Sequence, residues 1–214
     1  MKADARRDRL ARSRLYVVTG ARVDLGDLGR FLERILDAGV DIVQLREKGA
    51  EAGDLLRWGE TFRKAADRHD ALFIVNDRPD VAVALGADGV HLGQNDLPPA
   101  VARDFLGPEA IVGLSTHDRH QWDAAAREAD YLCAGPVWET PTKPGRPAAG
   151  LDLVRYAAKS DDRRPWFAIG GINPENLGEV TDAGAKRIVV VRAVTEASNP
   201  PAAAVSLLAG LPPA

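Results

Sequence analysis

The chain has 214 residues, a formal net charge of −3 and one cysteine. This length suits a large core, and the nearly balanced charge, without a long basic stripe, argues against nucleic acid as the main partner. No apolar stretch reaches the roughly 18 residues that span a bilayer, and a lone cysteine cannot form a disulfide within the chain, so we expect a protein of the reducing cytoplasm with no membrane partner.

The first segment of the chain, MKADARRDRLARSR, is basic and lacks an apolar centre. It therefore does not read as a secretory signal, and its charge predicts a frayed, solvated extension over residues 1–14. Residues 15–214 contain neither a linker nor a low-complexity tract, which predicts one domain.

Eight short apolar runs alternate with segments of helical periodicity in this domain. Unbroken runs rich in Val, Ile and Leu are typical of parallel strands that are buried on both faces. The predicted strands cover residues 15–19, 41–46, 71–75, 89–92, 110–114, 131–137, 165–169 and 187–191. Apolar stripes of the predicted helices lie at 28–36, 55–62, 81–85, 101–106, 122–126, 151–157, 177–183 and 202–208.

Eight strand–helix units in a chain of this length predict an α/β protein with a single (β/α)8 TIM barrel and short loops. The chief competitor is an open doubly wound sheet. A dinucleotide-binding sheet of that kind carries G-x-G-x-x-G after its first strand, whereas residues 17–29 read VVTGARVDLGDLG. This spacing favours the barrel.

Cations follow several of the predicted strands. In a barrel, residues at the C-terminal ends of the strands converge on one mouth. Arg46 and Lys48 follow the second strand, and Lys143 lies in the loop after the sixth. Three unpaired cations would repel one another, so we expect an anion to bind among them.

Two acids follow neighbouring strands: Asp77 comes after the third strand and Asp96 after the fourth. Either acid alone would more simply be a helix cap, but together they are hard oxygen ligands of the kind that Mg²⁺ takes beside substrate phosphate. The acids and the cations together predict a Mg²⁺–diphosphate site. Gly170-Gly171 and the turn after Val191 fall where barrels commonly bind a second phosphate, although a lone Gly-Gly is a weak signal.

The histidines and the cysteine carry weaker signals. His91 lies within an apolar run, where a packed histidine is commoner than a catalytic one. His117 shows no metal-ligand spacing and is expected to be solvated or to cap a helix. Cys133, with no basic neighbour, is expected to be a small core residue.

The ordered segments QLREK, ND, GVHLGQND, GLSTH, GPVWETPTKPG and IGGI resemble those of the thiamine-phosphate synthase family. The resemblance extends from residue 15 to about residue 194, and each motif falls at a predicted strand end. Members of the family join hydroxymethylpyrimidine diphosphate to a thiazole phosphate, giving thiamine phosphate and pyrophosphate. The resemblance therefore implies a Mg²⁺-dependent transferase with two small-molecule substrates; it leaves open whether the thiazole is carboxylated and whether the chain forms a homo-oligomer.

The same motifs imply roles for individual residues. Those expected to bind the pyrimidine diphosphate are Gln44, Arg46, Lys48, Asn76 and Ser115, with His91 among the substrate contacts and Asp77 and Asp96 on Mg²⁺. Those expected in a loop that closes over the phosphates, residues 139–150, are Thr140, Thr142 and Lys143. Those expected around the thiazole phosphate are Gly171, Val191 and Arg192, the last at a position where the family often has serine. A direct part in catalysis is expected of Arg46, Lys48, Ser115 and Lys143.

The implied chemistry suits these residue types. The nucleophile is a ring nitrogen with a free lone pair and no proton to lose, so no strong general base is required. The difficult step is the departure of pyrophosphate, whose growing charge cations would stabilise. We expect a dissociative path through a pyrimidine carbocation, which has to be kept from water.

Two alternatives stay open at this point. A thiazole tautomerase of the same barrel family would need a histidine for proton transfer and no diphosphate site, and Asp77, Asp96 and Lys143 argue against it. A non-catalytic barrel that only binds thiamine precursors is disfavoured because the set of charged residues is complete.

Overall fold

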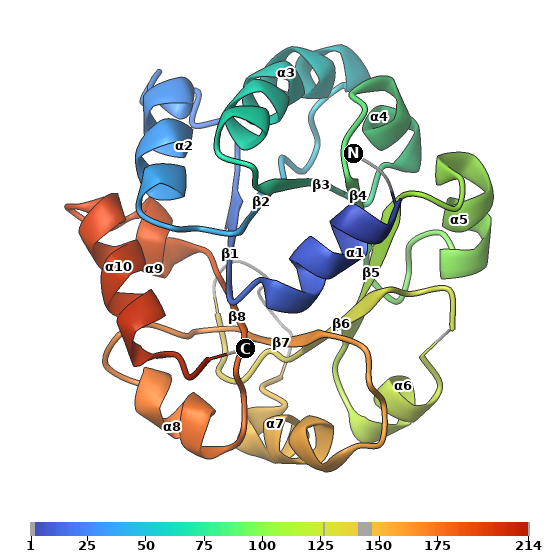
Figure 1. Cartoon of the computed structure of the whole chain (residues 1–214), viewed down its shortest axis with the longest axis vertical. Helices are drawn as coiled ribbons and strands as arrows, with labels where there is room; N and C mark the ends of the chain where they lie inside the picture. Colours follow the sequence, from blue (N-terminus) through green and yellow to red (C-terminus); the bar gives the residue numbers. More distant parts are fainter. Residues whose placement is uncertain (1–2, 126, 141–146, 214) are drawn as a thin grey trace.

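The structure, a computed structural model, describes residues 3–125, 127–140 and 147–213. In this part of the chain, eight parallel strands pair in sequence order and the last pairs with the first, which closes a barrel ringed by helices (Figure 1). The strands are β1 (Leu15–Thr19), β2 (Ile42–Leu45), β3 (Leu72–Asn76), β4 (Gly89–Leu92), β5 (Ile111–Thr116), β6 (Tyr131–Ala134), β7 (Trp166–Ile169) and β8 (Ile188–Val190). The surrounding helices are α2 (Leu28–Asp37), α3 (Ala52–Arg68), α4 (Pro79–Ala84), α5 (Pro99–Leu106), α6 (Arg119–Asp123), α7 (Gly150–Lys159), α8 (Leu177–Asp182), α9 (Arg192–Thr195) and α10 (Pro200–Gly210). The predicted TIM barrel is confirmed.

Both faces of the strands are buried, which explains their unbroken apolar sequences. Successive residues of β1 point to opposite faces: Tyr16 and Val18 belong to the cluster inside the barrel, whereas Leu15 and Val17 pack under the helices. Cys133 of β6 is 1 % exposed and belongs to the inner cluster, as expected of a small core residue.

Helices α2, α3, α5 and α7 around the barrel are amphipathic. Helix α2 buries the predicted apolar stripe, which consists of Leu28, Phe31, Leu32, Ile35 and Leu36. Within the described ranges, no helix is both long enough and apolar enough to cross a membrane. The barrel holds α2 through this apolar stripe, as the 3.6-residue periodicity predicts.

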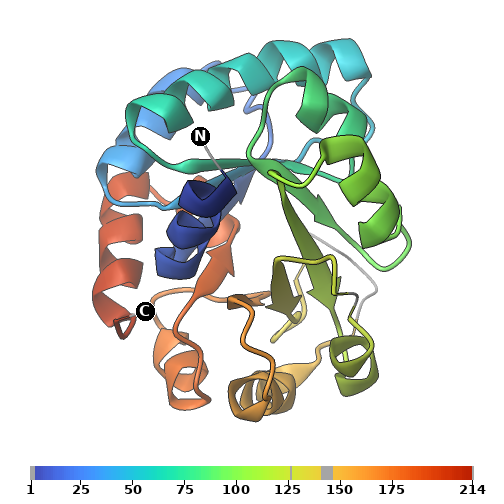
Figure 2. The same cartoon turned by 45° about the vertical axis from the view of Figure 1, so that its right-hand side comes forward.

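The N-terminal segment differs from the solvated extension that its sequence predicted. Residues Ala3–Arg12 form helix α1, which lies across the N-terminal end of the barrel (Figures 1 and 2). Leu10 is only 2 % exposed and joins the cluster inside the barrel. Arg6 Nε lies 2.9 Å from the buried carboxylate of Asp88. The local sequence could not predict this packing, because the acids that pair with the arginines of α1 lie far along the chain.

The loop after β6 begins earlier than predicted. β6 ends at Ala134 rather than at residue 137, since Pro136 has no N–H to donate to a neighbouring strand. The first residues of the loop still run alongside the end of β7, because the backbone N–H of Val137 donates to the Ile169 carbonyl over 2.8 Å. This pairing holds the first residues of the loop at the C-terminal mouth of the barrel.

Candidate active site

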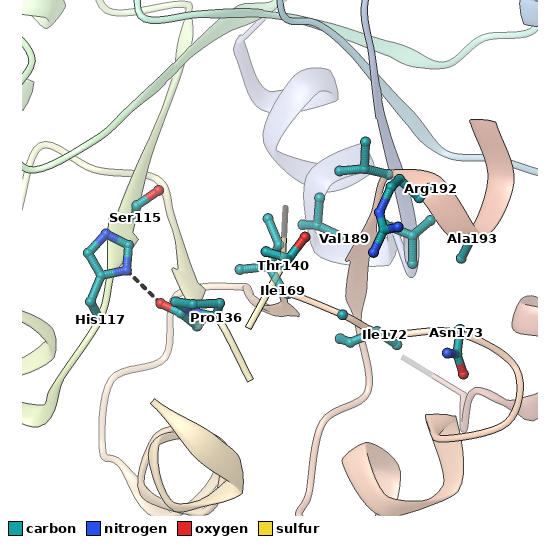
Figure 3. A pocket seen from close by; sticks show the side chains of 15 residues that line it. Ser115, His117, Pro136, Thr140, Ile169, Ile172, Asn173, Val189, Arg192 and Ala193 are labelled. Carbon is teal, nitrogen blue, oxygen red and sulfur yellow. Dashed lines mark hydrogen bonds between the residues drawn. The ribbon is translucent and has the colours of Figure 1, made fainter. Parts of the chain in front are cut away.

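The C-terminal ends of the last four strands surround a cavity of about 260 Å³ (Figure 3). Its walls come from segments that are distant in sequence, such as Ser115 in β5, Pro136 after β6 and Ile169 in β7. The predicted site residues that line this cavity are Ser115, Thr140, Gly171, Val191 and Arg192. Closure of the barrel is what brings them together.

The two glycines after β7 form a tight turn beside the cavity. Gly170 and Gly171 have φ angles of 106° and 73°, a left-handed backbone that favours glycine. A Cβ atom on Gly170 would lie 2.5 Å from Pro136 Cα, so a larger residue would displace the loop after β6. On the other side, Asn176 Nδ2 donates to the Gly171 carbonyl over 2.9 Å. The weak Gly-Gly signal therefore does mark a turn that lines the cavity.

Arg192 begins helix α9, across the cavity from Ser115 and His117 (Figure 3). Its side chain is 47 % exposed, and Nη1 lies 3.9 Å from the carboxylate of Glu196 one turn later. Such an exposed and loose ion pair contributes little free energy. The guanidinium could therefore exchange Glu196 for an anion in the cavity at little cost.

The loops after β3 and β4 bring Asp77 and Asp96 into contact on another part of the mouth. Burial, followed by a hydrogen bond to Asp96 and the charge of Asp96, raises the pKa of the Asp77 carboxyl to about 6, while Lys48 opposes this shift. Two carboxylates this close repel each other when both are ionised. The pair therefore favours either a shared proton or a cation between its members.

Neither acid caps a helix, which was the simpler role considered for each. Helix α4 follows Asp77 with Arg78 at its cap position, and helix α5 follows Asp96 with Pro98 at its cap position. Neither helix has a hydrogen bond from a capping side chain. Asp96 Oδ2 instead accepts from the backbone N–H of Gly93 over 2.7 Å, within its own loop. Helix capping therefore does not explain why these two acids lie at the mouth.

The chemistry of this acid pair fits a divalent cation. In the described part of the chain, no group of three or more His, Cys, Asp or Glu side chains could hold a metal ion. Mg²⁺ suits a site with two protein ligands, because it typically takes one or two carboxylates and fills its other positions with water and substrate phosphate. Asn76, the last residue of β3, hydrogen bonds to the Asp77 side chain and so helps to orient it.

The structure describes two of the cations predicted at the mouth, Arg46 and Lys48. Lys48 is exposed, and its charge acts on the Asp77 carboxyl. Arg46 is partly buried, and its Nε is buried without a hydrogen-bond acceptor among the described residues, which suits it to bind an anion. Thr142 and Lys143 fall in residues 141–146, outside the described residues, as does the middle of the predicted covering loop.

A chain of buried polar side chains crosses the inside of the barrel beneath the mouth. Gln44 Nε2 donates to the Tyr16 hydroxyl, which lies 3.0 Å from the Tyr131 hydroxyl. The Tyr131 hydroxyl lies 3.0 Å from His91 Nδ1. His91 Nε2 in turn lies 2.9 Å from Ser115 Oγ. The structure thus links three of the predicted site residues, Gln44, His91 and Ser115, through two tyrosines that sequence reasoning missed.

The tyrosines were missed because each stands in an apolar run that reads as a plain core strand. Tyr16 occurs in LYVVT and Tyr131 in YLCA, and both are fully buried. A buried tyrosine hydroxyl usually finds a hydrogen-bond partner. That rule is the signal that could have connected these strands to the site.

His117 lies in the site, contrary to the prediction that it would be solvated or a cap. It lines the cavity, and its Nδ1 lies 2.5 Å from the Gly135 carbonyl (Figure 3). The order of the strands already placed His117 at the mouth, directly after β5, but the absence of metal-ligand spacing, on which the solvated or capping role rested, does not exclude a place in the cavity wall.

Known proteins of one kind resemble this chain along nearly its full length. The family model described as thiamine monophosphate synthase matches residues 15–194. The chain is 55 % identical over 204 residues to the thiamine-phosphate synthase of Acidothermus cellulolyticus, an alignment that covers 94 % of this chain and 96 % of that protein. It is 57 % identical over 203 residues to that of Thermobifida fusca, covering 94 % and 93 %. A solved structure, the thiamine phosphate pyrophosphorylase from Pyrococcus furiosus, matches with a TM-score of 0.84 at 35 % identity, covering 95 % of this chain and 96 % of that one.

Proposed function

The chain belongs to the thiamine monophosphate synthase family, and we propose that it is a transferase that joins hydroxymethylpyrimidine diphosphate to a thiazole phosphate. The products are thiamine phosphate and pyrophosphate. The observation that carries this proposal is the division of the barrel mouth. An acid pair beside Lys48 suits a cation-bound diphosphate, and a separate cavity with Gly171 and Arg192 suits a second phosphate.

The pyrimidine diphosphate is assigned to the mouth around β2, β3 and β4. Asp77 and Asp96 would hold Mg²⁺, and Asn76 would hold the Asp77 side chain in place. Bound Mg²⁺ supplies charge neutralisation to the diphosphate. Arg46 and Lys48 add positive charge from the chain itself, and the buried Nε of Arg46 supplies a donor that no described residue engages. Lys143 and Thr142 stay predicted phosphate ligands.

The thiazole phosphate is assigned to the cavity at the ends of β5 to β8. Gly171, Val191 and Arg192 line one side of it, and Thr140 also reaches it. Ser115 lines the same cavity, although its motif had assigned it to the pyrimidine diphosphate, so we place it where the two substrates would meet. The cavity walls include the apolar side chains of Ile169 and Val189, which suit an aromatic ring.

The reaction requires positioning and charge stabilisation rather than a base. The attacking thiazole nitrogen has no proton to lose, so the residues of the mouth need only align the two substrates and stabilise the departing pyrophosphate. Loss of pyrophosphate first, giving a pyrimidine carbocation that the thiazole captures, is the path that we favour. Apolar cavity walls would help to keep water from that cation.

A test with both substrates separates this proposal from the alternatives. We expect thiamine phosphate and pyrophosphate to form when the protein is mixed with both substrates and Mg²⁺, and we expect EDTA to stop the reaction until Mg²⁺ is restored. A tautomerase would convert a thiazole carboxylate phosphate without the pyrimidine, and a non-catalytic barrel would bind the substrates without turnover. Full activity in excess EDTA would contradict the role given to the acid pair.

Arg192 allows the assignment of the two substrates to be tested separately. Arg192→Ser should raise the KM for the thiazole phosphate by about two- to tenfold, because an exposed cation adds a modest attraction to a phosphate. The KM for the pyrimidine diphosphate should stay near its wild-type value. Steady-state kinetics with each substrate varied in turn gives both numbers, and the opposite pattern would show that the two pockets are exchanged in our assignment.

A further inference from the structure

We propose that the buried chain of Gln44, Tyr16, Tyr131, His91 and Ser115, here called the relay, has a fixed hydrogen-bond direction that presents the Ser115 hydroxyl to the cavity as a donor. Ser115 is the member of the relay that lines the cavity. Tyr16 and Tyr131 therefore act through other side chains, as positioning residues. The relay runs from the strand of the predicted diphosphate site, β2, to the wall of the cavity at β5.

The direction follows from the number of protons along the relay. Burial raises the pKa of Tyr16 and of Tyr131, so each phenol keeps its single proton. Because Gln44 Nε2 donates to the Tyr16 oxygen, the Tyr16 proton is left for the Tyr131 oxygen 3.0 Å away. The Tyr131 proton is then left for His91 Nδ1, also 3.0 Å away.

This direction sets the tautomer of His91. The ring accepts at Nδ1 and carries its proton at Nε2, from which it donates to Ser115 Oγ over 2.9 Å. The Ser115 oxygen is thereby engaged as an acceptor, and its own proton is available to a group in the cavity. A hydroxyl set in this way selects hydrogen-bond acceptors, among which an anionic phosphate oxygen binds most strongly.

Packing keeps the relay in place. Tyr16 and Tyr131 are fully buried, and the Tyr131 ring stacks on His91 with 5.5 Å between ring centroids. Gly113 of β5 leaves room for that ring, since a Cβ atom there would lie 2.1 Å from it. Reversing the direction would require the Gln44 amide to turn and His91 to change tautomer, and any partial reversal leaves a buried polar group unpaired.

The relay can be tested in the ligand-free protein. NMR of the full chain with ¹⁵N-labelled histidine distinguishes the two tautomers, and His91→Gln identifies the His91 signals. We expect the Nε2–H tautomer to exceed the other by about tenfold or more, because the other leaves buried groups unpaired. Tyr131→Phe keeps the ring but removes the hydroxyl, so it should produce a mixture of tautomers. Tyr156→Phe, which removes an exposed hydroxyl bonded to Asp123, is the matched control and should leave His91 unchanged.

A second variant should reverse the relay. Glutamate at position 44 accepts where glutamine donates, so Gln44→Glu should draw the Tyr16 proton toward itself and move the His91 proton to Nδ1. If the buried carboxylate of Gln44→Glu prevents folding, Tyr131→Phe still tests the proposal. A wild-type His91 protonated at Nδ1, an unchanged spectrum in Tyr131→Phe, or an unchanged tautomer in folded Gln44→Glu would each overturn the proposal. The expectation that Ser115 donates to a phosphorylated substrate rests on the proposed function, but the NMR result does not, so the two can fail separately.

Discussion

Asp77→Asn is expected to make the protein much less active and, at the same time, more stable. Thiamine phosphate formation at saturating substrates and Mg²⁺ should fall about a hundredfold or more, the usual loss when one group that stabilises developing charge is removed. The asparagine side chain keeps the shape of the acid but cannot neutralise a cation. The remaining carboxylate of Asp96 would then have to hold Mg²⁺ with little help from its neighbour.

The gain in stability follows from the raised pKa of Asp77. The folded protein holds this proton to a pKa of about 6, above the ordinary value of 3.8, so the protonated group stabilises the fold below about pH 3.8 and that contribution is lost as the pH rises through 6. At pH 7 the charged pair therefore strains the ligand-free protein. The substitution removes a buried charge, the largest cause of the raised pKa, together with its repulsion from Asp96, and asparagine also tolerates the positive φ of 60° at this position. Because solvent screens part of this effect, we expect the substitution to raise the free energy of unfolding at pH 7 by about 1 kcal/mol, which raises Tm by roughly 2–4 °C.

The pH dependence provides a check on the cause of this gain. The difference in Tm between Asp77→Asn and wild type should be largest above pH 7 and should shrink toward pH 4, where Asp77 is protonated in the folded chain and partly so in the unfolded one. Asp80→Asn is the matched control, because Asp80 pairs with Arg78 over 2.6 Å on the exposed start of α4 and should affect activity little. Equal losses of activity in the two variants would remove the special role of Asp77.

The acid pair shows why sequence could predict part of the site. Asp77 and Asp96 are 19 residues apart in the sequence, but both follow strands of one parallel barrel. Strand ends are set by the period of the apolar runs, and the barrel then places all C-terminal ends at one mouth. Residues that belong to this pattern, such as Ser115 and Gly171, could therefore be assigned to the mouth from the order of the apolar runs alone.

Contacts across the barrel could not be predicted in the same way. Tyr16 and Tyr131 meet inside the ring because β1 and β6 face each other there, and neither local sequence reveals the partner. Helix α1 is a second case: its arginines looked solvated because a run of positive charge carries no sign of distant acids. Periodicity locates elements, whereas the pairing of polar groups depends on tertiary distance.

Asp88→Ala is expected to destabilise the protein strongly. The Asp88 carboxylate is 2 % exposed and accepts from Arg6 Nε over 2.9 Å, Arg63 Nη1 over 2.8 Å and the Phe73 backbone N–H over 2.9 Å. Removing it leaves two guanidinium groups without their buried counter-charge. Breaking a buried pair from one side typically costs about 3–5 kcal/mol, a large part of the roughly 5–15 kcal/mol that stabilises a domain. Urea unfolding followed by circular dichroism measures this loss.

Asp67→Ala provides the matched control, because Asp67 binds the same Arg63 side chain at 2.7 Å but is 65 % exposed. An exposed pair of this kind should contribute only about 0–1 kcal/mol. The two variants thus remove a carboxylate from the same arginine. The difference between their losses of unfolding free energy measures what is contributed by the burial of Asp88 and by its ion pair with Arg6 of α1. If Asp88→Ala cost no more than Asp67→Ala, helix α1 would be held by Leu10 and its other contacts rather than by this buried acid. Faster amide exchange in α1 of Asp88→Ala, with unchanged exchange there in Asp67→Ala, is the further result expected if the acid anchors the helix.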